Sequence, residues 1–263
     1  MAATTQKGEY HMNLEILYED QQILVCHKPA GVATETRRLG QQDMVSLLKN
    51  YRVGRDEEPY IGLVHRLDQP VEGVMVFAKT PVAAAELSRQ VQNRSIGKHY
   101  YAVGVMQEIT SLSLEEKIRG QIGENGTLTD YILFDKKRNV SSIVSQETPQ
   151  AKKALLDYHV IGTDGTRVCF DVALHTGRHH QIRLQLAHHG CPLVGDTKYG
   201  RVQRQDELAG SKNSESDDRI RDGSQLALCS YRLQFVHPST KKEMDFSIHP
   251  HNQAFDTFSD SLI

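Results

Sequence analysis

The sequence contains no long apolar run, no paired-cysteine motif and no secretory leader pattern, and each absence excludes a class of protein. No stretch approaches the ~20 consecutive apolar residues that a membrane-spanning helix needs. The N-terminal residues lack a cationic segment followed by an apolar one, which excludes a secretory signal. The cysteines lie far apart and mostly in apolar runs, which favours buried thiols over disulfides or a zinc site; they are Cys26, Cys169, Cys191 and Cys229. We therefore expect a cytoplasmic protein with no membrane anchor.

The sequence also lacks a strong net charge, a glycine-rich phosphate loop, an internal repeat and a linker between domains. The formal net charge of −2 argues against attachment to nucleic acid by bulk charge, but it leaves room for a local basic groove. Hydrophobic residues make up 38% of the 263 residues, as in ordinary globular proteins, and a chain of this length can bury a core within one large domain.

The spacing of apolar residues predicts more strands than helices. Strands are expected within 14–28, on both sides of 65–68, at 98–106 and 166–177, and in a final hairpin at 231–248; helices are expected at 41–54, 81–95 and 178–190. The polar segment at about 201–224 has no periodicity and predicts a mobile surface loop. Because the strands often follow one another directly, the pattern indicates an α+β fold with a mixed, mainly antiparallel sheet flanked by helices and loops.

The segment "HRLD" at 65–68 places ionisable residues between two apolar runs. In a strand, Arg66 and Asp68 would point to the same face, and a surface ion pair of little energetic value is one interpretation. The alternative is functional. Pro70 and Gly73 turn the chain directly afterwards, which would bring the Asp68 carboxylate to a strand end that faces a cleft.

The segment "GRHHQIRLQLAHHGCPLVGDTKYG" clusters cations at the start of a predicted helix, where backbone N–H groups bind phosphate or carboxylate. The cluster contains Arg178, His179, His180 and Arg183. The histidine pairs at 179–180 and 188–189 raise the question of a metal. They lie eight or more positions apart with no carboxylate that would complete a site, so no metal is expected.

The segment "KHYYAVGV" contains two adjacent tyrosines, Tyr100 and Tyr101. Neighbouring residues of a strand face opposite sides of the sheet. One tyrosine is therefore expected in the core and the other at the surface or in a pocket, and the pattern leaves open which.

Taken in order, these motifs resemble the RluA-like pseudouridine synthases over almost the full length of the chain. The resemblance is carried by "HRLD" with "GVMVFAKT" after it, "KHYYAV" at 98–103, "GRHHQIRLQLAHHGCPLVGDTKYG" at 177–200 and "LALCSYRLQFVHP" at 226–238. The opening "LYEDQQILVCHKPAGV" is also similar. Two departures concern substrate contacts: Val71-Glu72 replace the Thr-Ser that often precedes Gly73, and His179 replaces the usual Thr.

The resemblance implies an RNA pseudouridine synthase that acts on ribosomal or transfer RNA without a cofactor. It assigns Asp68 as nucleophile or base, Arg183 as its ion-pair partner and Tyr100 as the ring that stacks on the flipped uracil. The substrate-binding residues it implies are Arg66, His65, Lys98, Arg178, His180 and Gln181. We also expect a monomer with one catalytic domain at 13–263. The extension at 1–12 is too short for the N-terminal RNA-binding domain that many relatives carry.

These residue types suit the reaction. An ionised carboxylate can attack the ribose or remove a ribose proton, and the sequence leaves both routes open. A guanidinium can fix the carboxylate through paired hydrogen bonds. An aromatic face stabilises a base by roughly 1–3 kcal/mol without fixing its rotation, which suits a uracil that must turn before it rejoins the sugar.

Two other functions remain open at this stage. A non-catalytic RNA-binding or ribosome-assembly protein could use the same fold. A glycosidase would need a second carboxylate about 5–10 Å from Asp68, and Glu72 is the nearby candidate. The sequence does not identify the target RNA or uridine.

Overall fold

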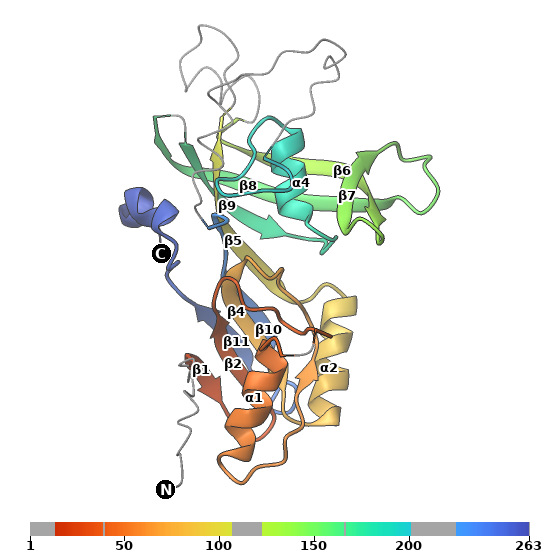
Figure 1. Cartoon of the computed structure of the whole chain (residues 1–263), viewed down its shortest axis with the longest axis vertical. Helices are drawn as coiled ribbons and strands as arrows, with labels where there is room; N and C mark the ends of the chain where they lie inside the picture. Colours follow the sequence, from red (N-terminus) through yellow and green to blue (C-terminus); the bar gives the residue numbers. More distant parts are fainter. Residues whose placement is uncertain (1–13, 39, 107–122, 166, 201–224, 263) are drawn as a thin grey trace, which may run out of the picture.

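The computed structural model describes residues 14–38, 40–106, 123–165, 167–200 and 225–262 (Figure 1). The predicted N-terminal extension at 1–12 and the predicted surface loop at 201–224 lie outside these ranges. Among the described residues, no helix is both long and apolar enough to cross a membrane.

One sheet of eleven strands organises the described part of the chain. Its order is β1-β2-β4-β10-β5-β9-β8-β6-β7, with β11 beside β10 and β3 beside β4. The strands are β1 (Ile16–Glu19), β2 (Ile23–Lys28), β3 (Gly62–Leu63), β4 (Glu72–Ala78), β5 (Gly97–Val105), β6 (Asn125–Asp135), β7 (Val140–Val144), β8 (Lys152–Asp164), β9 (Arg167–Leu174), β10 (Leu228–Val236) and β11 (Glu243–Ser247). Only the β4–β10 pairing is parallel among these strands, so the predicted mixed, mainly antiparallel sheet is confirmed.

Few helices accompany the sheet, and local sequence sets their ends. They are α1 (Met44–Val53), α2 (Pro81–Gln92), α4 (Gln181–His188) and the 3-10 helix η3 (Gln253–Ser261). Asp43 caps α1 by accepting from the Ser46 amide, and Thr80 caps α2 by accepting from the Ala83 amide. The predicted α2 start at Thr80 is confirmed, whereas α4 begins three residues later than expected.

Hydrophobic residues pack on both faces of the sheet. One cluster joins α1 and α4 to Tyr100 on β5, and the other joins α2 and η3 to Tyr101. Adjacent strand residues therefore serve opposite cores, as the alternation requires. In Figure 1, α1 and α2 accompany the lower part of the sheet and α4 the upper part, with β5 and β9 running between. All four cysteines are buried and free, which confirms the prediction of buried thiols.

Gly73 allows the close approach of β4 and β10. Its φ of +148° lies in a region that other residues rarely adopt. A Cβ at this position would lie 2.5 Å from the Ser230 Cβ and the Ser230 carbonyl oxygen. The glycine therefore fixes where β4 begins and where the preceding connection, which carries Asp68, must end.

The structure corrects one strand prediction and adds three strands that the sequence did not predict. The strand expected before Asp68 contains only β3, because the Leu67 amide and carbonyl bind the Thr34 hydroxyl (3.2 and 2.9 Å) instead of a neighbouring strand. Arg66 and Asp68 thus do not share a strand face. Strands β6, β7 and β8 were not predicted, because many of their side chains are exposed and polar, which weakens the apolar alternation.

Candidate active site

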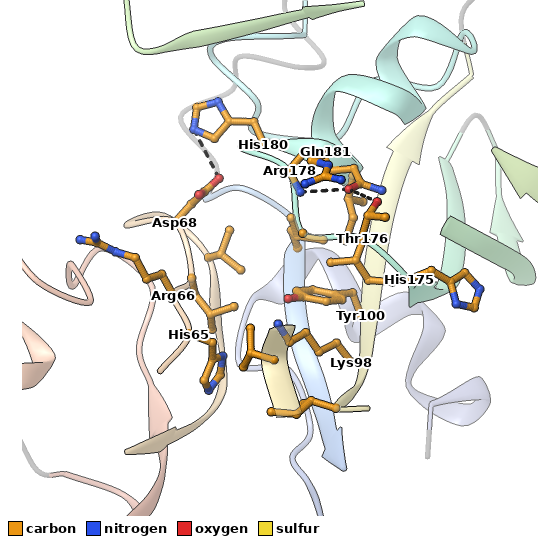
Figure 2. Close-up of a pocket in the computed structure, with 18 of the residues that line it drawn as sticks. His65, Arg66, Asp68, Lys98, Tyr100, His175, Thr176, Arg178, His180 and Gln181 are labelled. Carbon is orange, nitrogen blue, oxygen red and sulfur yellow. Dashed lines mark hydrogen bonds and ion pairs between the residues drawn. The ribbon is translucent and has the colours of Figure 1, made fainter. Parts of the chain in front are cut away.

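One cavity of about 530 Å³ brings the sequence-predicted segments together (Figure 2). Its lining comes from the β3–β4 connection, the end of α2, β5, the turn between β9 and α4, and α4 itself. All nine residues predicted for the site line it: His65, Arg66, Asp68, Lys98, Tyr100, Arg178, His180, Gln181 and Arg183. Asp68 and Arg183 meet here although they lie 115 positions apart in the chain.

The cavity is cationic although the whole chain is not. Its lining contains one carboxylate, that of Asp68, and five basic residues: Arg66, Arg94, Lys98, Arg178 and Arg183. Because the formal net charge of the chain is −2, this basic character is local. A basic cluster around a cavity favours a polyanionic ligand.

Asp68 lies in a tight turn that holds its carboxylate at the cavity. The Val71 amide donates to the Asp68 carbonyl (3.0 Å) across Pro70. The buried Lys28 ammonium donates to the carbonyls of Gln69 (3.2 Å) and Val32 (2.6 Å). The Asp68 side chain stays 29% exposed, so a ligand can reach it.

Asp68 receives two contacts, and both reach the same oxygen. Arg183 Nη1 donates to Oδ2 at 3.3 Å, and His180 Nε2 lies 3.4 Å from that oxygen. Among the described residues, no donor is recorded for the other oxygen, Oδ1. The carboxylate is therefore anchored on one side and open on the other.

The strongest partner of Arg183 is Asp196, which the sequence reasoning missed. Arg183 Nε and Nη2 donate to the two Asp196 oxygens at 2.8 and 2.7 Å, a bidentate pair. Asp196 is fully buried and also accepts from the amides of Lys198 and Tyr199 (2.8 and 3.0 Å). Burial acts to lower the pKa of Arg183, but hydrogen bonding to Asp196 outweighs it and the pKa is raised.

The segment "GDTKYG" carried a signal for this contact. Its carboxylate follows an apolar stretch that predicts burial, and a buried carboxylate requires a cation. The sequence could not show that the cation is Arg183, which α4 supplies.

His180 connects Asp68 to a second buried chain of hydrogen bonds. Its Nδ1 lies 2.8 Å from the Tyr199 hydroxyl, which accepts from the Ser141 amide at 2.9 Å. Burial, and then the charge of Arg183, lower the pKa of His180 to about 2, so the ring is neutral. Because the Tyr199 oxygen already accepts from Ser141, its O–H is available to donate to Nδ1, which leaves the ring hydrogen on Nε2, the nitrogen nearest Asp68.

His180 also has a left-handed backbone (φ +56°) at the start of α4. Such a conformation is costly for a residue other than glycine and is often found at functional sites. It explains why α4 begins at Gln181 and not at Arg178.

Tyr100 and Lys98 project from β5 into the same cavity, as Figure 2 shows. Burial raises the pKa of Tyr100 to about 12, so its phenol is neutral at pH 7. Burial lowers the pKa of Lys98, and no ion pair joins its ammonium to another described residue. An aromatic ring and an unpaired cation therefore lie together near Asp68.

The first two residues of the "HRLD" segment, His65 and Arg66, differ in character. His65 Nε2 accepts from the Val76 amide (3.0 Å), and burial lowers its pKa to about 3, so the ring is neutral and held by β4. Arg66 is exposed and lies 3.6 Å from Glu35, pointing away from Asp68 in Figure 2. The ion pair that sequence spacing suggested between Arg66 and Asp68 is absent.

Gln181 fixes the turn between β9 and α4. Its side-chain oxygen accepts from the Thr176 hydroxyl (2.8 Å) and the Arg178 amide (3.0 Å), and the residue is 3% exposed. Arg178 Nε donates to the Lys153 carbonyl (2.9 Å). Gln181 thus orients the backbone of the turn that carries Arg178.

Glu72 does not line the cavity. Its buried carboxylate accepts from the amides of His251 and Asn252 (both 3.1 Å) and lies 3.6 Å from His27 Nε2. Asp68 therefore has no second carboxylate beside it among the residues that line the cavity, which removes the support for a glycosidase.

One group of described residues has metal-ligand spacing, and it lies outside the cavity. The ligand atoms of Glu15, His27 and His251 fall within 4.8 Å of one another. His27 Nδ1 already hydrogen-bonds to Glu15 (2.8 Å). The histidines at 179–180 and 188–189 are not in this group.

Comparison with known proteins gives consistent matches. A family model described as RNA pseudouridylate synthase matches residues 22–188. The "Ribosomal large subunit pseudouridine synthase D" of Vibrio cholerae is 34% identical over 236 residues, covering 89% of this chain and 66% of that protein. The protein of the same name from Pseudomonas aeruginosa is 34% identical over 235 residues, covering 89% and 67%. The chain thus spans about two thirds of the length of these relatives.

Two solved structures share the fold. "Human RNA Pseudouridylate Synthase Domain Containing 4" superposes with a TM-score of 0.67 at 21% identity, covering 90% of this chain and 89% of that one. "Human RNA Pseudouridylate Synthase Domain Containing 1" gives 0.63 at 20% identity, covering 94% of both. These likenesses confirm the α+β fold. The family match and the identity to the curated relatives confirm the family that the motifs predicted: this chain belongs to the RNA pseudouridylate synthases.

Proposed function

We propose that this chain is an RNA pseudouridine synthase that uses Asp68 as its catalytic carboxylate. The observation that carries the proposal is the position of Asp68 in a cationic cavity, anchored by Arg183 and His180 and close to Tyr100. Ribosomal large-subunit RNA is the first substrate to test, because the curated relatives carry that name. Transfer RNA is the alternative.

The open oxygen of Asp68 gives the carboxylate its role. Because Arg183 and His180 both contact Oδ2, Oδ1 is the oxygen that faces an incoming ribose. The hydrogen bond from Arg183 also stabilises the negative charge of the carboxylate before the reaction. Asp196 holds the Arg183 guanidinium in plane, so the nucleophile is positioned in advance.

The reaction is an isomerisation, so its atoms balance without a co-reactant. The bond from ribose C1′ to uracil N1 breaks, and its electron pair leaves with the uracil. Oδ1 either bonds to C1′ or takes the neighbouring C2′ proton to leave a glycal. After the base turns, C1′ bonds to uracil C5 while the Oδ1–C1′ bond breaks or, on the glycal route, while the proton returns from Asp68 to C2′. C5 then loses its proton and N1 gains one, which regenerates the Asp68 carboxylate.

Tyr100 and Lys98 are suited to hold the detached base. Stacking on the Tyr100 ring would retain the uracil while it rotates, at roughly 1–3 kcal/mol. The Lys98 ammonium has no carboxylate partner among the described residues, so its charge can offset the negative charge of the departing uracil. Arg66, exposed at the cavity edge, is placed to contact the displaced nucleotide or its phosphate.

His65, His180 and Gln181 are proposed to position the site and not to bind the base. Their polar atoms contact β4, Asp68 with Tyr199, and the β9–α4 turn respectively. Arg178 remains a proposed RNA contact. A cytoplasmic monomer with a catalytic domain at 13–263 also remains a proposal, supported by the continuous sheet and the free, buried cysteines.

A tritium-release assay tests the proposal. Large-subunit ribosomal RNA transcribed with uridine tritiated at C5 would lose tritium as each pseudouridine forms. We expect Asp68→Asn to lower the release rate by at least about 10³-fold with unchanged melting temperature, the scale of a lost nucleophile. Asp245→Asn, which alters an exposed carboxylate on β11, is the matched control and should retain activity.

Full activity in Asp68→Asn would overturn the assignment of Asp68. RNA binding without tritium release by the unmutated chain, on both ribosomal and transfer RNA, would favour the non-catalytic alternative.

A further inference from the structure

Two arginines line the cavity on the side formed by the end of α2 and the β9–α4 turn. Arg94 follows α2, and Arg178 begins the turn that leads to α4. Neither side chain forms an ion pair with another described residue. Arg94 lies outside the motifs that carry the family resemblance, and the proposed reaction does not use it.

The backbone holds Arg94 in an unusual conformation. The Ser95 amide donates to the Gln90 carbonyl (3.0 Å) and the Arg94 amide to the Val91 carbonyl (3.2 Å). These are the two hydrogen bonds of a Schellman motif, and Arg94 occupies its left-handed position (φ +58°). Glycine is preferred there, because a side chain strains the left-handed backbone. The chain instead places a long cation at this fixed point on the cavity edge.

Arg178 is also held in place with part of its guanidinium free. Its Nε donates to the Lys153 carbonyl (2.9 Å), and Gln181 accepts from its amide, so both backbone and side chain are oriented. Among the described residues, no acceptor is recorded for its terminal nitrogens. These two nitrogens are therefore available to a ligand.

The two guanidinium groups influence each other electrostatically. Burial lowers the pKa of Arg178, and the positive charge of Arg94 lowers it further. Two like charges facing one cavity without a carboxylate between them are unfavourable until an anion enters. Phosphate oxygens match the fork of an arginine, and two forks can share one phosphate.

We propose that Arg94 and Arg178 form a phosphate clamp that binds the RNA backbone next to the target uridine, across the cavity from Arg66. The inference rests on the proposed function in that the anion is taken to be RNA. In Figure 2, Arg66 and Arg178 lie on opposite sides of the space that holds Asp68 and Tyr100. The clamp and Arg66 would then hold the strand on both sides of the flipped nucleotide, which fixes which uridine reaches Asp68.

The experiment measures RNA affinity against salt concentration. The probe is a fluorescently labelled fragment of large-subunit ribosomal RNA, titrated with Arg94→Gln, Arg178→Gln and the double variant at 0.1–1 M salt. Each lost phosphate contact removes about 0.7–0.9 from the slope of log affinity against log salt. Each single variant should therefore bind about five-fold more weakly at 0.1 M salt, with the difference vanishing towards 1 M.

Arg89→Gln is the matched control, because Arg89 is exposed on the same helix, pairs with Glu86 and does not line the cavity. A slope for Arg94→Gln and Arg178→Gln equal to that of Arg89→Gln would overturn the clamp. Arg94→Gly separates binding from structure. Glycine fits the left-handed position, so this variant should keep its melting temperature and still lose affinity.

The clamp and the proposed reaction can fail separately. If tritium release is normal and the salt slope does not change in the arginine variants, the clamp is wrong and the reaction stands. If the slope changes but the unmutated chain releases no tritium, the clamp stands and the reaction is wrong.

Discussion

Two buried histidines of this chain, His180 and His27, each lie beside a carboxylate, yet their pKa values are shifted in opposite directions. In the cavity, Asp68 lies 3.4 Å from His180 Nε2, and the pKa of His180 is lowered. On β2 and β4, Glu72 lies 3.6 Å from His27 Nε2, and the pKa of His27 is raised. Both histidines are buried. The chemical groups are of the same kind, so the difference must come from what surrounds them.

The charged groups around the two histidines differ. Burial lowers the pKa of both histidines, and beside His180 the positive charge of Arg183 lowers it further. Beside His27, the carboxylates of Glu72 and Glu15 outweigh burial and favour the charged ring. The cavity thus keeps a neutral histidine beside a carboxylate that is already paired with arginine. The other cluster places His27 beside two carboxylates, which raise its pKa and favour the charged form of the ring.

Among the variants that test this comparison, the largest effect on activity is expected when Arg183 loses a charged partner. Asp196→Asn removes one of the two charged acceptors of Arg183, so the guanidinium loses its fixed plane beside Asp68. We expect kcat for tritium release to fall by about 10–100-fold per folded molecule, because small displacements at a reacting group cost rates of this size. The KM for RNA should change little, since Asp196 is fully buried and does not line the cavity. An unchanged kcat would contradict the positioning role.

The next effect is on stability and should leave catalysis intact. Glu72→Gln replaces a buried carboxylate that accepts from the His251 and Asn252 amides and contacts His27. We expect the free energy of unfolding to fall by about 2–4 kcal/mol, the scale of lost hydrogen bonds to a charged group. Urea denaturation measures this value, and activity per folded molecule should match that of the unmutated chain. A selective loss of activity would mean that the two clusters are coupled.

The smallest effect is a pair of opposite pH dependences. The folded pKa of His27 lies above its ordinary 6.5, so its stabilisation is full below pH 6.5 and is lost as pH rises through the folded value. The folded pKa of His180 is lowered to about 2, so its stabilisation is present above pH 6.5 and is lost as pH falls below that value. One proton changes stability by at most about 1.4 kcal/mol per pH unit.

Urea denaturation of His27→Gln, His180→Gln and the unmutated chain across pH 5–9 measures how each variant's loss of unfolding free energy changes with pH. The destabilisation by His27→Gln should be larger at pH 6 than at pH 9, and that by His180→Gln should be smaller at pH 5 than at pH 7. Because each variant is compared with the unmutated chain, the other titrating groups cancel. If both losses changed with pH in the same direction, the charges of Arg183 and Glu15 would not explain why the two histidine pKa values are shifted in opposite directions.

Local sequence predicted much of the fold. The all-apolar core of β2 and β4, the Thr80-Pro81 start of α2 and the final hairpin were each visible in spacing and capping residues. Strands β6 to β8 were not, because exposed strands have no strong apolar alternation. The strand predicted before Asp68 is shorter than expected and contains only β3, because the Thr34 hydroxyl, and not a neighbouring strand, binds the backbone of Leu67.

By itself the sequence determined the family, the residue types of the site and the order of its motifs. Only the tertiary structure decided which charges meet. Arg66, two positions from Asp68, lies at the edge, while Arg183 and His180 contact the carboxylate from α4 and its cap. Asp196 is the main partner of Arg183 because α4 packs against the segment that follows it in the chain. The physical reason is that spacing along the chain fixes a residue's face within its own element, whereas charge pairing depends on distances set by packing between elements.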